Sequence, residues 1–215
     1  TSALLTRPTW RSCLLNNVLI GVARARARHG VRRVAVLDFD VHHGNGNAAL
    51  VADNPALLYV SSHQSPLFPG TGTAAGRDGR SVNAPLPPRA GSAEFRKAWR
   101  EALLPTVVDF GADALFVSAG FDAHRNDPLG ALRLHEDDFG WLTAQIVRLG
   151  LPVVSVLEGG YDLPALRSSV RAHVEALAQC ECGGGAGAEP QRRANGWRGG
   201  GGRARHARRM AEAEA

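Results

Sequence analysis

Residues 34–44 read VAVLDFDVHHG, so four apolar residues lead directly into acids and histidines. The apolar part predicts a buried β-strand, and alternate side chains along a strand point to the same face. We therefore expect Asp38, Asp40 and His42 to project together at the end of this strand. Two carboxylates beside an imidazole indicate a metal site. The alternative is a helix-capping or ion-pair network at a strand-to-loop junction.

The same pattern of an apolar run followed by polar residues occurs twice more. Residues 114–117 read ALFV and are followed by SAGFDAHRNDPLG at 118–130, and VVSVL at 153–157 is followed by EGGYD at 158–162. Ligand sites of open parallel sheets lie at the carboxyl ends of the strands. The three polar clusters are therefore expected to converge if their strands are neighbours.

The rest of the chain alternates between helical and strand patterns. Strands separated by helices predict parallel crossovers, and hence an α/β fold with a parallel β-sheet flanked by helices. Ser92 is expected to cap a helix. The loop 62–89 is expected to form the rim of a site, or else a Pro/Gly-rich surface excursion. The predicted helices are 13–27, 93–109, 136–149 and 163–178, and the predicted strands are 32–38, 56–61, 114–118 and 152–157.

The composition favours one globular domain in a reducing environment. A chain of 215 residues with 44% hydrophobic content can bury a substantial core. No apolar run approaches the ~18 residues of a membrane span, so no membrane association is expected. The three cysteines, Cys13, Cys180 and Cys182, form no Cys-x-x-Cys pair. An odd count of this kind predicts an intracellular protein of the cytoplasm or nucleus.

The positive charge is concentrated at the carboxyl end. In residues 183–215, seven arginines against three glutamates account for +4 of the formal net charge of +5. This Gly/Arg-rich segment has few large apolar side chains and is expected to be disordered. Its arginines can contact nucleic-acid phosphates weakly, whereas the alternative is a solvated extension of biased composition.

Four motifs follow one another along the chain: DFDVHHGNG at 38–46, LFPGTG at 67–72, SAGFDAH at 118–124 and LEGGY at 157–161. In this order they resemble the histone deacetylase and acetylpolyamine amidohydrolase family, in its class II-like form, which shares its fold with arginase. The resemblance covers about residues 13–178. It implies a three-layer α/β/α fold and the zinc-dependent removal of acetyl groups from acetyl-lysine in histones or other proteins.

The resemblance also implies an active site. Asp40, His42 and Asp122 match the three zinc ligands of the family, and three protein ligands leave an open coordination position, as in catalytic zinc sites. Tyr161 matches the tyrosine whose hydroxyl donates a hydrogen bond to the substrate carbonyl oxygen as that oxygen becomes an oxyanion. The alternative for Tyr161 is a turn residue that caps a strand.

Further matches lie around this site. Phe68 matches an aromatic wall of the channel that holds the acetyl-lysine stem, although a phenylalanine beside proline can equally belong to the core. Asp38 and Ser61 match family residues that contact a buried monovalent cation, K⁺. The family residue that Asp38 matches also supports a catalytic histidine. The alternative for Asp38 is a buried acid held by backbone amides. His43 and His124 are expected to support the ligands or the fold.

The chain departs from the family near its amino end. CLLNN at 13–17 matches a family segment that follows a tandem histidine pair, the pair that transfers protons, yet residues 1–12 contain no histidine, and Ser12 replaces a second channel aromatic. We expect residues 1–12 to be a truncated or diverged segment, 13–178 a partial catalytic domain and 179–215 the tail.

Such a fragment is expected to have impaired activity. The alternative is a catalytically inactive relative that binds metal or acts as an interaction module. The implied substrates are an acetylated protein or peptide, such as a histone tail or a tubulin-like substrate, or an acetylpolyamine.

Overall fold

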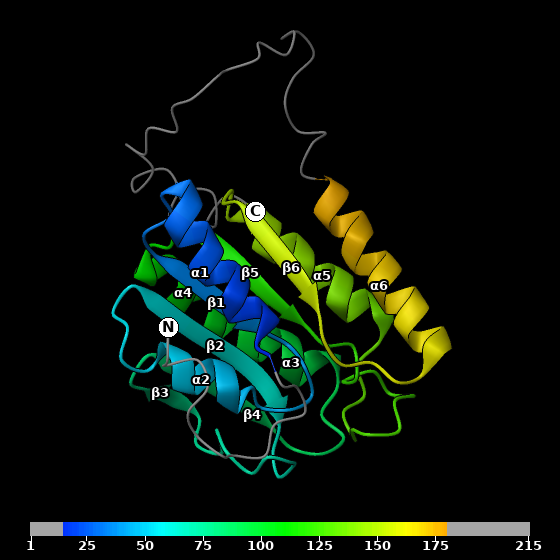
Figure 1. The fold of residues 1–215 in the computed structure, drawn as a ribbon. Helices are drawn as coiled ribbons and strands as arrows, with labels where there is room; N and C mark the ends of the chain where they lie inside the picture. Colours follow the sequence, from blue (N-terminus) through cyan, green and yellow to red (C-terminus); the bar gives the residue numbers. More distant parts are fainter. Residues whose placement is uncertain (1–14, 180–215) are drawn as a thin grey trace, which may run out of the picture.

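The computed structural model describes residues 15–179, which form a six-stranded sheet between two layers of helices (Figure 1). The strand order is β3-β4-β2-β1-β5-β6, and every pairing is parallel except that of β3 with β4. This confirms the predicted α/β class. The strands are β1 (Val34–Asp38), β2 (Leu57–Gln64), β3 (Gly76–Asp78), β4 (Ser81–Leu86), β5 (Ala114–Ala119) and β6 (Val153–Leu157). The helical elements are α1 (Asn17–His29), α2 (Asn45–Val51), α3 (Ser92–Ala98), the π-helical turn η1 (Trp99–Leu103), α4 (Leu104–Phe110), α5 (Glu136–Arg148) and α6 (Leu163–Ala178).

β1 is the centre of the core. All five of its residues are buried, because β2 and β5 flank it and helices cover both faces. Val34 and Val36 pack with α1 and α2 on one face, while Ala35 and Leu37 pack with α3, α4 and α5 on the other (Figure 1). A strand that is apolar on both faces is typical of a parallel sheet buried between helices.

The register of the central strands aligns their polar ends. Asp38 at the end of β1 lies opposite Ser61 of β2 on one side and Ser118 of β5 on the other. The segments that follow β1 and β5 therefore leave the sheet side by side. This register explains how residues about 80 positions apart in sequence reach the same site.

The predicted loop 62–89 contains regular structure, so that part of the prediction is wrong. β2 continues to Gln64, and β3 and β4 form within the segment. Pro85 lowers the strand propensity of β4 because proline has no N–H to donate. β3 pairs with Ser81–Asn83 only, so at Pro85 one side of β4 has no partner strand among the described residues. The short helix α2 was likewise not predicted.

The predicted helix 93–109 is present but is interrupted by η1, and its cap differs from the prediction. Gly91, not Ser92, is the N-cap residue, and its N–H donates to the Glu94 carboxylate at 2.9 Å. The Ser92 hydroxyl instead donates to Asp138 of α5 at 2.7 Å. The serine therefore joins two helices rather than capping one.

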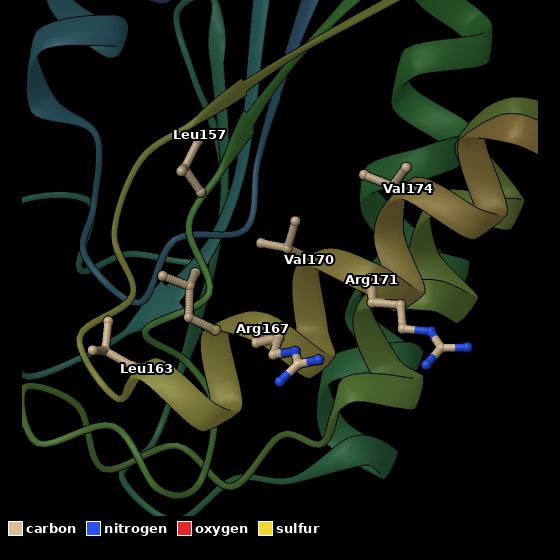
Figure 2. A pocket seen from close by; sticks show the side chains of 7 residues that line it. Leu157, Leu163, Arg167, Val170, Arg171 and Val174 are labelled. Atoms are coloured by element: carbon tan, nitrogen blue, oxygen red, sulfur yellow. The ribbon is translucent and has the colours of Figure 1, made fainter.

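β6 forms one edge of the sheet, and an open apolar groove of about 520 Å³ lies between its end and α6 (Figure 2). None of the candidate site residues lines it. The lining residues are Leu157, Leu163, Leu166, Arg167, Val170, Arg171 and Val174. Among residues 15–179, no helix is long and apolar enough to cross a membrane.

His173 is a buried histidine that joins α6 to α5 and β6. The Thr143 hydroxyl donates to the Phe139 carbonyl at 2.7 Å, so it accepts from His173 Nδ1, which is 2.6 Å away. Nε2 then accepts from the Ser155 hydroxyl at 2.8 Å. Burial lowers the pKa of His173 to about 4, which keeps the ring neutral at physiological pH.

We expect His173 to make the fold sensitive to acid. Its pKa is about 4 in the folded state against 6.5 ordinarily, so the unfolded state binds the extra proton between these values. The free energy of unfolding should therefore fall as the pH drops from 6.5 to 4, by about 3 kcal/mol from this residue. The measurement is urea unfolding across this pH range. His173→Gln should reduce this dependence by the contribution of His173, while the exposed His29→Gln should leave it unchanged. An equal slope in the His173→Gln variant would contradict the assignment.

Candidate metal centre

The three predicted ligands meet at the carboxyl ends of β1 and β5. Asp40 and His42 follow β1, Asp122 follows β5, and one donor atom of each lies within 4.8 Å of the others. β1 ends at Asp38, so Asp40 and His42 lie in the bend beyond it rather than on a regular strand. The predicted convergence therefore occurs, although Asp38 does not join this cluster.

The ring nitrogen Nδ1 of His42 lies between two carboxylates. It is 3.0 Å from Asp40 Oδ1 and 3.1 Å from Asp122 Oδ2. The backbone fixes both acids, because Val41 N–H donates to Asp122 Oδ1 at 2.9 Å and His42 N–H donates to Asp40 Oδ1 at 2.8 Å. The donor atoms are thus held in place by the main chain of the same bend.

The electrostatics of the cluster favour a cation. Hydrogen bonds to Asp122 and Asp40 raise the pKa of His42 to about 10, so in the absence of a metal the ring carries a proton between the two acids. Burial raises the pKa of Asp122 to about 6, and its hydrogen bond with His42 opposes that rise. One nitrogen and two carboxylate oxygens form a donor set that suits zinc. A metal bound here would displace the His42 proton.

Two glycines allow the backbone to approach these carboxylates closely. A Cβ atom added at Gly120 would overlap the Asp40 side chain, and one added at Gly159 would overlap that of Asp122. The N–H of Gly159 also donates to Asp40 Oδ2 at 3.2 Å. The cluster is therefore enclosed by backbone that no other residue type could supply without movement. The residue types fit a bound zinc ion, and the glycines extend the site beyond the predicted ligands.

Asp38 lies in a separate buried polar layer with Ser61. Asp38 Oδ1 accepts the N–H of Asp40 at 3.1 Å, and Oδ2 accepts the Tyr59 hydroxyl at 2.9 Å and the Asn47 amide at 3.3 Å. Burial, followed by the charge of Asp40, raises the pKa of Asp38 well above its ordinary value. Sequence reasoning missed Tyr59, which lies inside β2, and Asn47, which lies in the unpredicted helix α2.

Ser61 and His43 have partners in the neighbouring loop and strand. The Ser61 hydroxyl lies 2.9 Å from His63 Nδ1, and His43 Nδ1 lies 2.7 Å from the Thr71 hydroxyl. The rings of His43 and His63 are tilted against each other with centroids 4.7 Å apart. Burial, followed by the charge of His63, lowers the pKa of His43 to about 4.

His124 contacts its own loop and α5 rather than the cluster. Its Nε2 lies 3.3 Å from Glu136 Oε2, and its Nδ1 accepts the N–H of Asn126 at 3.2 Å. The side chain is buried. The two ring nitrogens therefore connect the loop that carries Asp122 to α5.

Tyr161 and Phe68 both lie in loops that follow strand ends on the side of the cluster. Tyr161 comes two residues after Gly159 and is 53% exposed, and Phe68 follows β2 and is 49% exposed. Their half-exposed rings are compatible with groups that meet a substrate. Their roles nevertheless remain predictions from the sequence.

Comparisons with known proteins agree with this geometry. The model of the histone deacetylase domain matches residues 12–177. A probable deacetylase of Methanothermobacter thermautotrophicus is 43% identical over 173 residues, which cover 77% of this chain and 52% of that protein. The chain spans about half the length of the curated relatives it matches.

Solved structures give the same result. The acetylpolyamine aminohydrolase of Burkholderia pseudomallei matches with a TM-score of 0.70 and 36% identity, covering 78% of this chain and 51% of that chain. The HD domain of HDA15 matches with a TM-score of 0.73 and 34% identity, and the match covers 78% of this chain and 50% of that chain. The motifs, the sheet and the converging ligand candidates thus agree with the domain match, and the chain belongs to the histone deacetylase family.

Proposed function

We propose that the chain is the zinc-binding part of an amidohydrolase that removes acetyl groups from acetylated amines. The observation that carries this proposal is the convergence of Asp40, His42 and Asp122 within 4.8 Å at the end of the sheet. Membership of a family that includes a probable deacetylase and an acetylpolyamine aminohydrolase supports acetyl-lysine or an acetylpolyamine as the substrate class. Residues 13–178 would then form part of a catalytic domain.

The proposed roles of the side chains follow from their chemistry. Zinc, when bound, polarises a carbonyl and lowers the pKa of a bound water. Asp40, His42 and Asp122 hold the ion, and the hydroxyl of Tyr161 donates a hydrogen bond to the substrate oxygen as negative charge develops on it. Phe68 packs against the apolar stem of the substrate.

The buried layer behind the cluster has a second proposed role. Asp38 carries a raised pKa because burial penalises its charged form, and a monovalent cation held with Ser61 would offset that penalty. Asp38 and Ser61 lie opposite each other in the sheet register, which supports a shared contact.

The test is acetyl release by two versions of the protein. A version extended at its amino end by the tandem-histidine segment of the family should hydrolyse an acetyl-lysine peptide or an acetylpolyamine. A chelator should stop this hydrolysis, and added zinc should restore it. The 215-residue chain should be slower by ~10²–10⁴-fold, because general acid–base catalysis contributes about that much and residues 1–12 contain no histidine.

Two outcomes would contradict this proposal. Hydrolysis by the 215-residue chain at the rate of the extended version would show that the tandem histidines are not needed. An extended version that binds zinc but releases no acetate would favour the second candidate, a metal-binding interaction module without catalysis. The observation that favours this second candidate is that residues 1–12 contain no histidine.

A further inference from the structure

Two hydrogen bonds join the loop after β5, residues 120–130, to the loop after β6, residues 158–162. The N–H of Phe121 donates to the Gly159 carbonyl at 2.7 Å. The Asp127 carboxylate accepts the N–H of Tyr161, also at 2.7 Å. The first loop therefore holds the Gly159–Tyr161 segment at both of its ends.

Asp127 is itself fixed and buried. Its N–H donates to the His124 carbonyl at 2.9 Å, its Oδ1 accepts the N–H of Leu129 at 2.9 Å, and only 6% of the residue is exposed. Both carboxylate oxygens thus accept backbone N–H groups. An asparagine offers one acceptor and one donor in the same place, so it would set an NH₂ group against one of these N–H groups.

The segment that Asp127 holds is one that needs restraint. Gly159 and Gly160 precede Tyr161, and Gly160 has a φ of 140°, which L side chains rarely adopt. Two successive glycines leave the backbone many alternative conformations. A short hydrogen bond to a charged acceptor is among the stronger ones in proteins. This bond therefore restrains the backbone from which the Tyr161 side chain projects.

We propose that Asp127 is a positioning residue that fixes the backbone of Tyr161 relative to the metal cluster. Asp122 and Asp127 lie in the same loop, so one segment would hold both a metal ligand and the oxyanion-binding tyrosine at a set separation. This inference rests on the proposed function, in which the Tyr161 hydroxyl acts on the substrate. Asp127 touches neither substrate nor metal and acts through Tyr161.

The test is a double-mutant cycle in the version extended by the tandem-histidine segment. Asp127→Asn should lower kcat by about 10- to 100-fold, because small misplacements of a group that acts in the transition state have effects of this size. KM and zinc content should stay unchanged. In a Tyr161→Phe background, Asp127→Asn should lower kcat less than twofold, because the hydroxyl that it positions is gone.

Asp113→Asn is the matched control. Asp113 also accepts two backbone N–H groups, from Arg32 at 3.0 Å and Arg33 at 2.9 Å, but it lies immediately before β5, at the other end of the sheet from the cluster. The Asp113→Asn substitution should lower the stability of the fold but leave kcat within twofold of the unsubstituted protein. An equal loss of kcat from the control would show that any weakening of the fold reduces turnover, and would overturn the positioning role.

A second measurement needs neither a variant nor activity. In the unmodified 215-residue chain, the amide of Tyr161 should exchange its hydrogen at least tenfold more slowly than the amide of the exposed residue Ala75. Exchange of the two amides at equal rates would overturn the proposal, as would an unchanged kcat in Asp127→Asn or an equal loss of kcat in both backgrounds. Failure of the proposed function is distinguishable, because Tyr161→Phe alone would then leave kcat unchanged while the Tyr161 amide stayed protected.

Discussion

Replacing Asp122 by alanine should weaken zinc binding to the 215-residue chain by more than about 100-fold. Loss of groups that merely support a zinc ligand typically costs 10–100-fold, and Asp122 is proposed to contact the metal itself. Asp122 is fully buried and lies 3.1 Å from His42 Nδ1, so no water-exposed group can readily replace it. The measurement is zinc content after dialysis, together with the zinc Kd from competition with a chelator.

Two further variants separate the loss of a ligand from a general loss of structure. Asp122→Asn keeps an oxygen that can accept the N–H of Val41 but removes the charge, so the fold should persist while zinc affinity falls. Asp113→Ala removes a remote carboxylate and should retain zinc. Equal zinc content in the unmodified chain and both Asp122 variants would remove Asp122 from the ligand set.

In the version extended by the tandem-histidine segment, Tyr161→Phe should lower kcat by about 10²–10³-fold. Loss of one donor to a developing oxyanion has an effect of this size, because the hydrogen bond strengthens as charge forms in the transition state. KM and zinc content should change little, since the proposed hydroxyl contact stabilises neither the ground state nor the metal. Steady-state kinetics and metal analysis provide the measurement. Unchanged kcat would leave Tyr161 as a turn residue.

The convergence of the metal cluster could be predicted because it depends on the sheet alone. An apolar run marks where β1 and β5 lie, and parallel neighbours bring whatever follows them to one edge. The strand pattern predicted only that the polar segments converge, whereas the choice of Asp40, His42 and Asp122 as ligands came from the family resemblance. The alternation along the strand grouped Asp38 with Asp40 and His42, but the strand ends at Asp38, which accepts the N–H of Asp40 and does not belong to the three-residue cluster.

What the sequence could not reveal are contacts that depend on position rather than residue type. β4 was missed because Asn83 and Pro85 carry weak strand propensity, while its pairing with β2 decides its conformation. Asp127 has no pattern that separates it from any other loop acid, since its partners are backbone N–H groups. The close approach of Gly120 and Gly159 to the carboxylates likewise depends on the packed loops, although glycine at both positions was a visible signal.

The pairing of β1 with β5 also sets the order in which the metal site can assemble. Asp40 and His42 are two residues apart, so their side chains can come into contact in an unfolded chain. Asp122 lies 80 residues after His42 in the sequence. Pairing over such a separation is slow, because the loop must close before the contacts form. Coordination of the proposed zinc ion by all three residues would then arise late, and the ion would contribute little to the folding transition state. Bound zinc would accordingly lengthen the lifetime of the folded chain by slowing its unfolding, with much less effect on the rate at which the chain folds.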